Sequence, residues 1–322
     1  MQGAVLVSKY TMDSTTLLLG ALAAPTVVWL ITYFAPLVLV WILPPQNLKK
    51  KYDAEWALVT GGGSGIGRAL VEALAGQGFN VVIVSLDDKF LEDTYASVSA
   101  RFAGQDFRRV GVTFKPGVDY MGKIIEATKD IKVQCVFNNA GYMVTGFYDS
   151  SEVGKQDANM ECNATAAAKI THHFVSLLVK GRLRGCVVFT SSVVAYIPSP
   201  FSVMYGATKA FLSNMAASLA VEVRARGVDV LAVHPSPVAS QFYANLEHKI
   251  DLIDQAQNTA VAPSTIPDAI FKSVGRVIWR DLGGMAVGVR VGTKMLGYSF
   301  FAGVFARAAP YLGDYKKNDA GR

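Results

Sequence analysis

The stretch Thr60-Gly-Gly-Gly-Ser-Gly-Ile-Gly67 decides the fold, and it follows a short apolar run, Trp56–Val59. Glycines let a chain turn sharply and let its backbone approach a phosphate group closely. The helical pattern Arg68–Gln77 begins directly after the turn, and the free N–H groups at the start of a helix attract phosphate. A strand, a glycine turn and a helix in this order predict a turn that binds the pyrophosphate of a dinucleotide. The spacing is G-x-x-x-G-x-G rather than the commoner G-x-G-x-x-G.

Short apolar runs alternate with helical patterns along the chain beyond this turn. The runs are apolar without a polar alternation, which is typical of strands covered on both faces in a parallel sheet. We therefore predict a doubly wound α/β fold, with helices on both faces of the sheet, over residues 52–283. The predicted strands are Trp56–Val59, Asn80–Val84, Val110–Phe114, Val133–Phe137, Cys186–Phe189 and Val228–Val233, and a second helix is predicted over Tyr205–Arg226.

Tyr205 and Lys209 are one helical turn apart and therefore lie on the same face of the predicted helix. A phenol with a pKa near 10 is a poor acid or base at neutral pH, and a nearby ammonium is expected to lower that pKa. Alone, such a pair is more often an ordinary exposed one. Ser192 changes this reading, because it follows a predicted strand, where ligands bind in such sheets. Its hydroxyl can stabilise negative charge on a substrate oxygen, so we predict a catalytic site at these three residues.

Three motifs in the expected order resemble those of the short-chain dehydrogenase/reductase family: Thr60-Gly61-x-x-x-Gly65-Ile66-Gly67, Asn138-Asn139-Ala140-Gly141 and Tyr205-x-x-x-Lys209. The resemblance covers about residues 56–242. It implies a Rossmann-type three-layer fold and an enzyme that moves a hydride between a nicotinamide cofactor and a carbonyl or hydroxyl carbon. It also implies a fourth catalytic residue, Asn163, which lies within a helix and helps connect the lysine to water.

The resemblance further implies a set of cofactor contacts. Asn138 would support the centre of the sheet, while Ala140 and Gly141 would pass beside the ribose. Val238 would contact the nicotinamide carboxamide through its backbone, and Ser236 stands where the family usually has glycine, so the turn is expected to differ slightly. The full predicted set is Thr60, Gly61, Ser64, Gly65, Ile66, Gly67, Ser85, Asn138, Ala140, Gly141, Tyr205, Lys209, Pro235, Val238 and Ser240.

The end of the second predicted strand bears on the choice of cofactor. An acid there usually binds the ribose of NAD, whereas an arginine accommodates the phosphate of NADP. Ser85 stands in the place of the acid and Leu86 in the place of the arginine, so neither determinant is present. Asp87 would repel a 2′-phosphate and Lys89 would attract one. Membrane-bound reductases of this type mostly use NADPH, so the resemblance favours NADP(H) over NAD(H).

The composition favours contact with lipid, because 51% of the residues are hydrophobic, 17% are charged and the mean hydropathy is +0.30. The net charge of +6 is not gathered in basic runs with interleaved aromatic residues, which argues against a nucleic-acid partner. The cysteines Cys135, Cys162 and Cys186 form no CxxC pair and are predicted to be reduced thiols. We predict no metal site, and His234 is expected to pack rather than to catalyse.

Residues 15–43 carry no charge and are long enough to cross a bilayer, for which roughly 20 apolar residues suffice. A cleavable signal peptide would have a shorter apolar region. Pro25 and Pro36 leave two arrangements open, a bent span or a hairpin in one leaflet. The lysines at 49–51, compared with Lys9 and Asp13 on the other flank, place the rest of the chain in the cytosol.

Residues 162–242 resemble the very-long-chain 3-oxoacyl-CoA reductase/17β-hydroxysteroid dehydrogenase group most. This resemblance implies a lipid-like substrate and a membrane-anchored enzyme at the endoplasmic reticulum with its site facing the cytosol. A retinoid or sphingoid ketone is an alternative substrate, and a non-catalytic subunit of a membrane assembly is an alternative role. A homodimer stays open as well.

The apolar segment 284–322 has two predicted arrangements. It either lies on a membrane interface or caps a lipid pocket, or it packs on the core or on another subunit.

Overall fold

The computed structural model describes residues 14–319 except residues 245 and 249. Contacts within the chain divide it into two compact units, residues 1–44 and residues 45–322. The flanking charges Lys9 and Asp13, on which the predicted orientation partly depends, lie outside the described residues.

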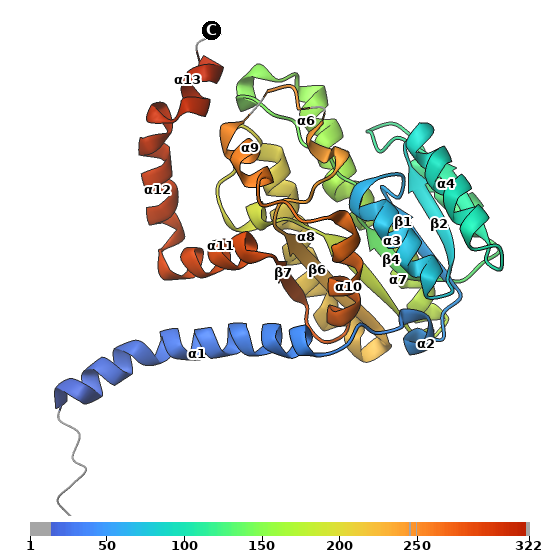
Figure 1. The fold of residues 1–322 in the computed structure, drawn as a ribbon, viewed down its shortest axis with the longest axis horizontal. Coiled ribbons are helices and arrows are strands. Elements are labelled where there is room, and N and C mark those ends of the chain that lie inside the picture. Colours follow the sequence, from blue (N-terminus) through green and yellow to red (C-terminus); the bar gives the residue numbers. More distant parts are fainter. Residues whose placement is uncertain (1–13, 245, 249, 320–322) are drawn as a thin grey trace, which may run out of the picture. The chain divides into compact units, whose positions relative to one another are not determined.

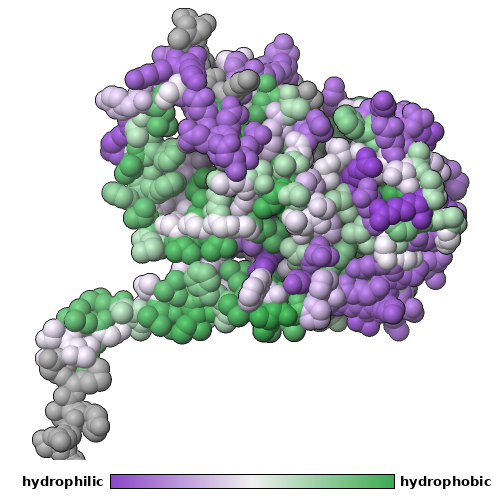
Figure 2. Space-filling model, viewed as in Figure 1, coloured by the Kyte–Doolittle hydropathy of each residue, from purple (hydrophilic) through white to green (hydrophobic). Residues whose placement is uncertain are grey.

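The first unit contains one continuous helix, α1 (Ser14–Ile42; Figure 1), which carries no charged residue and is largely apolar (Figure 2). At 1.5 Å per residue a helix of 29 residues is about 44 Å long, which exceeds the hydrocarbon thickness of a bilayer. By length and composition, α1 could therefore cross a membrane. Pro25 and Pro36 both lie inside the helix, so the described segment has no turn of the kind that a hairpin requires.

The second unit is built on a sheet of seven parallel strands in the order β3-β2-β1-β4-β5-β6-β7 (Figure 1). The order reverses between β1 and β4, as the doubly wound prediction requires, so that prediction is confirmed. The central strands are buried throughout, which explains their continuous apolar sequences. The strands are β1 (Trp56–Thr60), β2 (Asn80–Ser85), β3 (Phe107–Gly111), β4 (Val133–Asn138), β5 (Gly185–Thr190), β6 (Val228–Pro235) and β7 (Trp279–Leu282).

Helices cover both faces of this sheet and form two separate apolar cores. One core contains side chains of α5, α7 and α8, and the other contains side chains of α2, α3, α4 and α10. The helices of the central part of the chain are α2 (Leu48–Tyr52), α3 (Gly65–Gly76), α4 (Lys89–Arg101), α5 (Tyr120–Thr128), α6 (Val153–Met160), α7 (Ala166–Lys180), α8 (Val203–Val223), α9 (Asp251–Gln257) and α10 (Ile266–Ser273).

Two strands differ from the prediction. The third strand was predicted over Val110–Phe114 but occupies Phe107–Gly111. It is an edge strand, so Arg108 and Arg109 are tolerated within it, and their guanidinium groups lie over aromatic rings of the neighbouring elements. The short strand β7 was not predicted, because Arg280 and Asp281 interrupt its apolar pattern.

The lysines at 49–51 lie in α2, and two of them bind groups elsewhere in the second unit. Lys51 Nζ lies 3.0 Å from Asp229 Oδ2 and donates to the carbonyl of Val274. Lys49 donates to the carbonyl of Gly78. These contacts fix α2 against the sheet and reduce the charge that is free to face a membrane.

The chain ends in three further helices, α11 (Gly284–Met295), α12 (Tyr298–Ala308) and α13 (Gly313–Asp319). The first, α11, contacts β7. The last, α13, returns to α9, where Asp314 accepts a hydrogen bond of 2.7 Å from the backbone of Asp251 and Lys317 pairs with the Asp251 carboxylate.

Candidate active site

A cavity of about 640 Å³ lies at the carboxyl ends of the strands, where ligands bind in open parallel sheets. Its volume falls within the range of small-molecule sites, roughly 300–1,000 Å³. Four of the predicted site residues, Thr60, Gly67, Asn138 and Asn163, do not line it. The predicted residues that line the cavity are Gly61, Ser64, Gly65, Ile66, Ser85, Ala140, Gly141, Ser192, Tyr205, Lys209, Pro235, Val238 and Ser240.

The glycine turn runs from β1 into α3 and requires glycine on steric grounds. Gly61 and Gly65 have φ of +64° and +54°, a region that other residues rarely adopt. A Cβ on Gly67 would lie 1.9 Å from the carbonyl oxygen of Gly61, so only glycine permits this close backbone approach. Ser64, the N-cap of α3, makes no side-chain cap bond, which leaves the first N–H groups of the helix available to an anion.

Two predicted residues support the neighbouring turn rather than the cavity itself. The hydroxyl of Thr60 accepts hydrogen bonds of 3.0 Å from the backbone N–H groups of Asn139 and Ala140, which joins the ends of β1 and β4. Asn138 donates to the hydroxyl of Thr171 on α7 at 2.9 Å. These bonds hold the Asn-Asn-Ala-Gly segment against the glycine turn, as a continuous cofactor cradle requires.

Ser192, Tyr205 and Lys209 meet at one wall of this cavity, and all three are buried. Ser192 lies two residues beyond the end of β5, and the other two project from the first turns of α8. The ammonium of Lys209 donates to the carbonyl of Thr190 at 2.7 Å and lies 5.5 Å from the centre of the Tyr205 ring. The structure therefore brings together the three side chains that the sequence analysis linked.

The pKa of Tyr205 differs from the prediction. Burial raises the pKa of this phenol above its ordinary value, the nearby Tyr243 adds to the rise, and a hydrogen bond with Ser192 partly opposes it. Burial also lowers the pKa of the Lys209 ammonium to about 8, against a smaller opposing effect of Cys162. The predicted net fall of the phenol pKa is therefore wrong, because desolvation outweighs the charge of an ammonium that is directed at a backbone carbonyl. The phenol is protonated at neutral pH.

Asn163 lies in a short π-helical turn, η2 (Glu161–Thr165), between α6 and α7. Its amide oxygen accepts a hydrogen bond of 3.0 Å from the N–H of Tyr142, and its amide nitrogen donates to the carbonyl of the same residue at 2.8 Å. A Cβ on Gly141 would lie 3.2 Å from the Asn163 oxygen and 3.3 Å from Lys209 Nζ. The asparagine thus sits on the lysine side of the site and clamps the loop that carries Tyr142, while its predicted link to water stays a prediction.

The segment after β6 closes the cavity over the glycine turn. Val238 pairs with Val261, and the Ser240 hydroxyl accepts a hydrogen bond from the N–H of Phe242. A Cβ on Gly65 would lie 3.1 Å from the Ser240 side chain. The predicted nicotinamide-side segment and the predicted phosphate turn therefore face each other across one site.

Comparison with known proteins identifies the family. The family model described as short chain dehydrogenase matches residues 55–251, more than half of the chain, and this range contains the glycine turn, Ser192, Tyr205 and Lys209. The chain belongs to the short-chain dehydrogenase family. It is an NAD(P)-dependent oxidoreductase.

Several known proteins resemble this dehydrogenase over most of its length. A very-long-chain 3-oxoacyl-CoA reductase of Scheffersomyces stipitis is 28% identical over 274 residues, which cover 80% of this chain and 76% of the relative. A 17-beta-hydroxysteroid dehydrogenase type 3 of Mus musculus is 30% identical, over 65% of this chain and 67% of the relative. A solved 7beta-hydroxysteroid dehydrogenase superposes with a TM-score of 0.69 at 24% identity, covering 79% of this chain and 96% of that chain, and this likeness supports the fold alone.

The β2–β3 end of the dehydrogenase cavity contains a cation that sequence reasoning missed. Ser85 and Leu86 line the cavity as expected, and the segment after β3 adds Val112, Thr113, Phe114 and Lys115. The N–H of Val112 donates to the carbonyl of Ser85 at 2.8 Å, which places the two segments side by side. Asp87 does not line the cavity, because it packs against Gly111. The sequence analysis did not place Lys115 here because it predicted the third strand too late in the chain. With the observed end of β3 at Gly111, Lys115 follows the strand and lies at this edge of the sheet.

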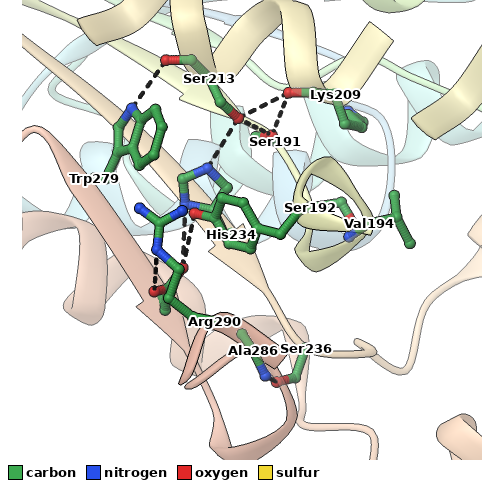
Figure 3. Close-up of polar contacts among 12 residues, drawn as sticks. Ser191, Ser192, Val194, Lys209, Ser213, His234, Ser236, Trp279, Ala286 and Arg290 are labelled. Atoms are coloured by element: carbon green, nitrogen blue, oxygen red, sulfur yellow. Dashed lines mark hydrogen bonds and ion pairs between the residues drawn. The ribbon is translucent and has the colours of Figure 1, made fainter. Parts of the chain in front are cut away.

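On the opposite side of the dehydrogenase cavity, Ser236 and His234 connect the site to α11 (Figure 3). The Ser236 hydroxyl accepts a hydrogen bond of 3.0 Å from the N–H of Ala286 in the first turn of α11. Ser236, which stands where the family usually has glycine, therefore caps the start of α11 although it lies far from this helix in the chain. Burial, with a smaller effect of Arg290, lowers the pKa of His234 to about 3, so the ring is neutral. Its Nε2 lies 2.9 Å from the hydroxyl of Ser213.

Arg290 completes this network from α11 (Figure 3). Its guanidinium lies 4.0 Å from the ring centre of Tyr196 and 4.5 Å from that of Trp279, and its Nε lies 3.9 Å from the carboxylate of Asp281. Tyr196 donates to the same carboxylate at 3.0 Å. Because Tyr196 ends the short helix that begins directly after Ser192, α11 is tied to the segment that carries the predicted catalytic serine.

Proposed function

We propose that this dehydrogenase is a membrane-anchored reductase of lipid ketones, with long-chain 3-oxoacyl thioesters and steroids as the first candidate substrates. The observation that carries the proposal is a buried, protonated Tyr205 beside Lys209 and Ser192, in the wall of a cavity with aromatic lining residues. Residues 15–43 serve as the anchor, residues 52–283 as the catalytic domain, and the endoplasmic reticulum membrane as the site, with the catalytic domain in the cytosol.

The side chains divide the work of ketone reduction among them. A bound nicotinamide cofactor supplies the hydride. Ser192 donates a hydrogen bond to the substrate carbonyl, and Tyr205, which burial keeps protonated, delivers its proton to the same oxygen. Lys209 stabilises the phenolate that remains, because its ammonium lies on the face of the ring. Asn163 holds the Tyr142 loop that borders the site.

Two observations support a lipid-like substrate. Tyr142, Phe242 and Tyr243 line the cavity, and the ring of Phe242 lies 5.5 Å from that of Tyr205, so a bulky apolar group beside the reacting carbonyl would be well accommodated. The apolar helix α1 would keep the enzyme at a bilayer, where such substrates dissolve.

One charged contact supports NADPH over NADH. Lys115 lines the β2–β3 end of the cavity, where the ribose of the adenosine would lie. Asp88 lines the same region but its carboxylate already accepts a hydrogen bond of 3.1 Å from the N–H of Leu91 as the cap of α4. A 2′-phosphate would therefore meet an available cation and an anion that is turned toward a helix.

The test is an assay of the full chain purified in detergent. Oxidation of NADPH and of NADH is followed with long-chain 3-oxoacyl-CoA, a steroid ketone, retinal, a sphingoid ketone and a small water-soluble ketone. We expect turnover with the first two and a preference for NADPH. Reduction of the small ketone alone would contradict the lipid proposal, and selective reduction of retinal or the sphingoid ketone would transfer it to that class.

A further inference from the structure

Helix α12, in the C-terminal part of the chain, exposes a large apolar surface. No residue of this described helix is buried. Phe300 is 64% exposed, and just beyond the helix Tyr311 is 80% exposed. Figure 2 shows hydrophobic residues gathered over α11 and α12. The exposed large apolar side chains of this region are Met295, Leu296, Tyr298, Phe300, Val304 and Tyr311. Surfaces of this kind mark sites that bind a membrane or a partner.

The helix before α12 is fixed to the catalytic core, so this exposure is not that of a frayed chain end. The Ser236 hydroxyl holds the N–H of Ala286, and Arg290 lies between the rings of Tyr196 and Trp279 (Figure 3). Beyond α12, the chain is held again where Asp314 caps α9. The apolar surface therefore lies between two anchored points of the second unit.

The charges of this region indicate what covers the surface. Residues 283–313 contain no aspartate or glutamate, while Lys294 and Arg307 are exposed cations. Tyr298 and Tyr311 lie near the two ends of the apolar surface, and tyrosine is enriched where protein meets the headgroup region of a bilayer. A helix with an apolar face and flanking cations binds in the plane of an anionic lipid interface.

We propose that α12, with Met295, Leu296 and Tyr311, is a lipid-docking surface that inserts its apolar side chains into an anionic membrane interface. It is a second membrane contact in addition to the proposed anchor α1. Because α11 is tied to the segment of Ser192, the surface holds the site of this dehydrogenase at a fixed distance from the lipid.

The experiment uses the full chain reconstituted into vesicles of phosphatidylcholine with phosphatidylserine. Phe300→Cys is labelled with an environment-sensitive fluorophore, and Val221→Cys is the matched control, because Val221 is an exposed apolar residue on α8. Unaltered protein reports background labelling. Its Cys135 and Cys186 are buried, while Cys162 is partly exposed in the cavity and burial raises its pKa to about 12, which lowers the reactivity of this thiol. We expect a spin-labelled lipid to quench position 300 several-fold more than position 221, and less in pure phosphatidylcholine.

The outcomes separate this proposal from the anchor. A chain that floats with the vesicles but whose position 300 is quenched no more than position 221 contradicts the docking surface alone. If the label at position 300 is shielded from water without quenching by lipid, a protein partner covers the surface and the proposal is wrong. A chain that does not float at all contradicts both membrane proposals. None of these readouts depends on the substrate or the cofactor.

Discussion

The two ends of the cavity are built in different ways. The nucleotide end is built on eight consecutive residues, 60–67, whose backbone makes the turn, and the Thr60 hydroxyl joins this turn to the N–H groups of Asn139 and Ala140. The opposite end depends on segments far apart in the chain, from Ser192 on one side to Asp281 and Arg290 on the other. A local turn fails when one atom no longer fits, whereas a distributed support weakens gradually. Substitutions should therefore separate loss of cofactor binding from loss of substrate positioning.

The largest effect is expected for Tyr205→Phe, which removes the proton donor without changing the shape of the site. Turnover should fall by about 10²–10⁴-fold, the usual contribution of a positioned acid. NADPH affinity, measured by nucleotide fluorescence, should change far less than turnover. Tyr243→Phe at the same cavity is the control, and equal losses in the two variants would remove Tyr205 from its proposed role.

Gly67→Ala tests the nucleotide end. The new Cβ would lie 1.9 Å from the Gly61 carbonyl oxygen, so the turn must move and NADPH binding should be lost in a calorimetric titration. Gly76→Ala, in the same helix, has no atom within 4 Å of its new Cβ and should bind normally, with a stability change of at most about 1 kcal/mol. Normal binding by the Gly67 variant would show that the turn does not contact the cofactor.

Arg290→Ala tests the distributed end. Loss of a desolvated cation between two rings should lower the free energy of unfolding by about 2 kcal/mol. It should also raise KM for the ketone or lower kcat while NADPH affinity is kept. Arg290→Lys should restore little, because lysine lacks the planar group that stacks. The control is Lys294→Ala, an exposed lysine of the same helix, and a matching loss there would deny Arg290 a special role.

Lys209 should give activity and stability opposite dependences on pH. Its pKa is lowered to about 8 in the folded state from 10.5, so above pH 8 the ammonium is lost and kcat/KM should fall. Between these two values the unfolded chain binds more protons than the folded chain, so this residue makes stability rise with pH in that window. Urea unfolding of the wild type and of Lys209→Met across this pH range isolates the contribution of Lys209 to stability. If the free energies of unfolding of the two proteins change in parallel with pH, Lys209 makes no such contribution.

The smallest effect is expected for Lys115→Ala. Removal of one charged contact to a 2′-phosphate should weaken NADPH binding about tenfold, which corresponds to ~1.4 kcal/mol. NADH affinity should stay unchanged, and so should the affinities of Lys89→Ala, because Lys89 does not line the cavity. An equal loss for both nucleotides would mean that Lys115 supports the loop rather than recognises the phosphate.

The sequence alone predicted most of the sheet and the meeting of Ser192, Tyr205 and Lys209, because strand ends in a parallel sheet converge on one edge and a helical turn aligns two side chains. It could not predict the partners of Ser236 and Arg290, since these depend on the path of a C-terminal helix about 50 residues beyond the cavity segment. The sequence also predicted the wrong direction for the pKa shift of Tyr205, because the burial that raises this pKa exists only in the folded chain.

The π-helical turn η2 gives the site a dependence on chain length. A π turn holds one residue more than an α turn, and each residue of a regular helix turns the following side chains by about 100°. Deleting one residue from 161–165 other than Asn163 would restore a regular helix and turn Asn163 away from Tyr142. In an alignment of related sequences, a gap in these five positions would therefore disrupt this clamp even where every functional side chain is retained.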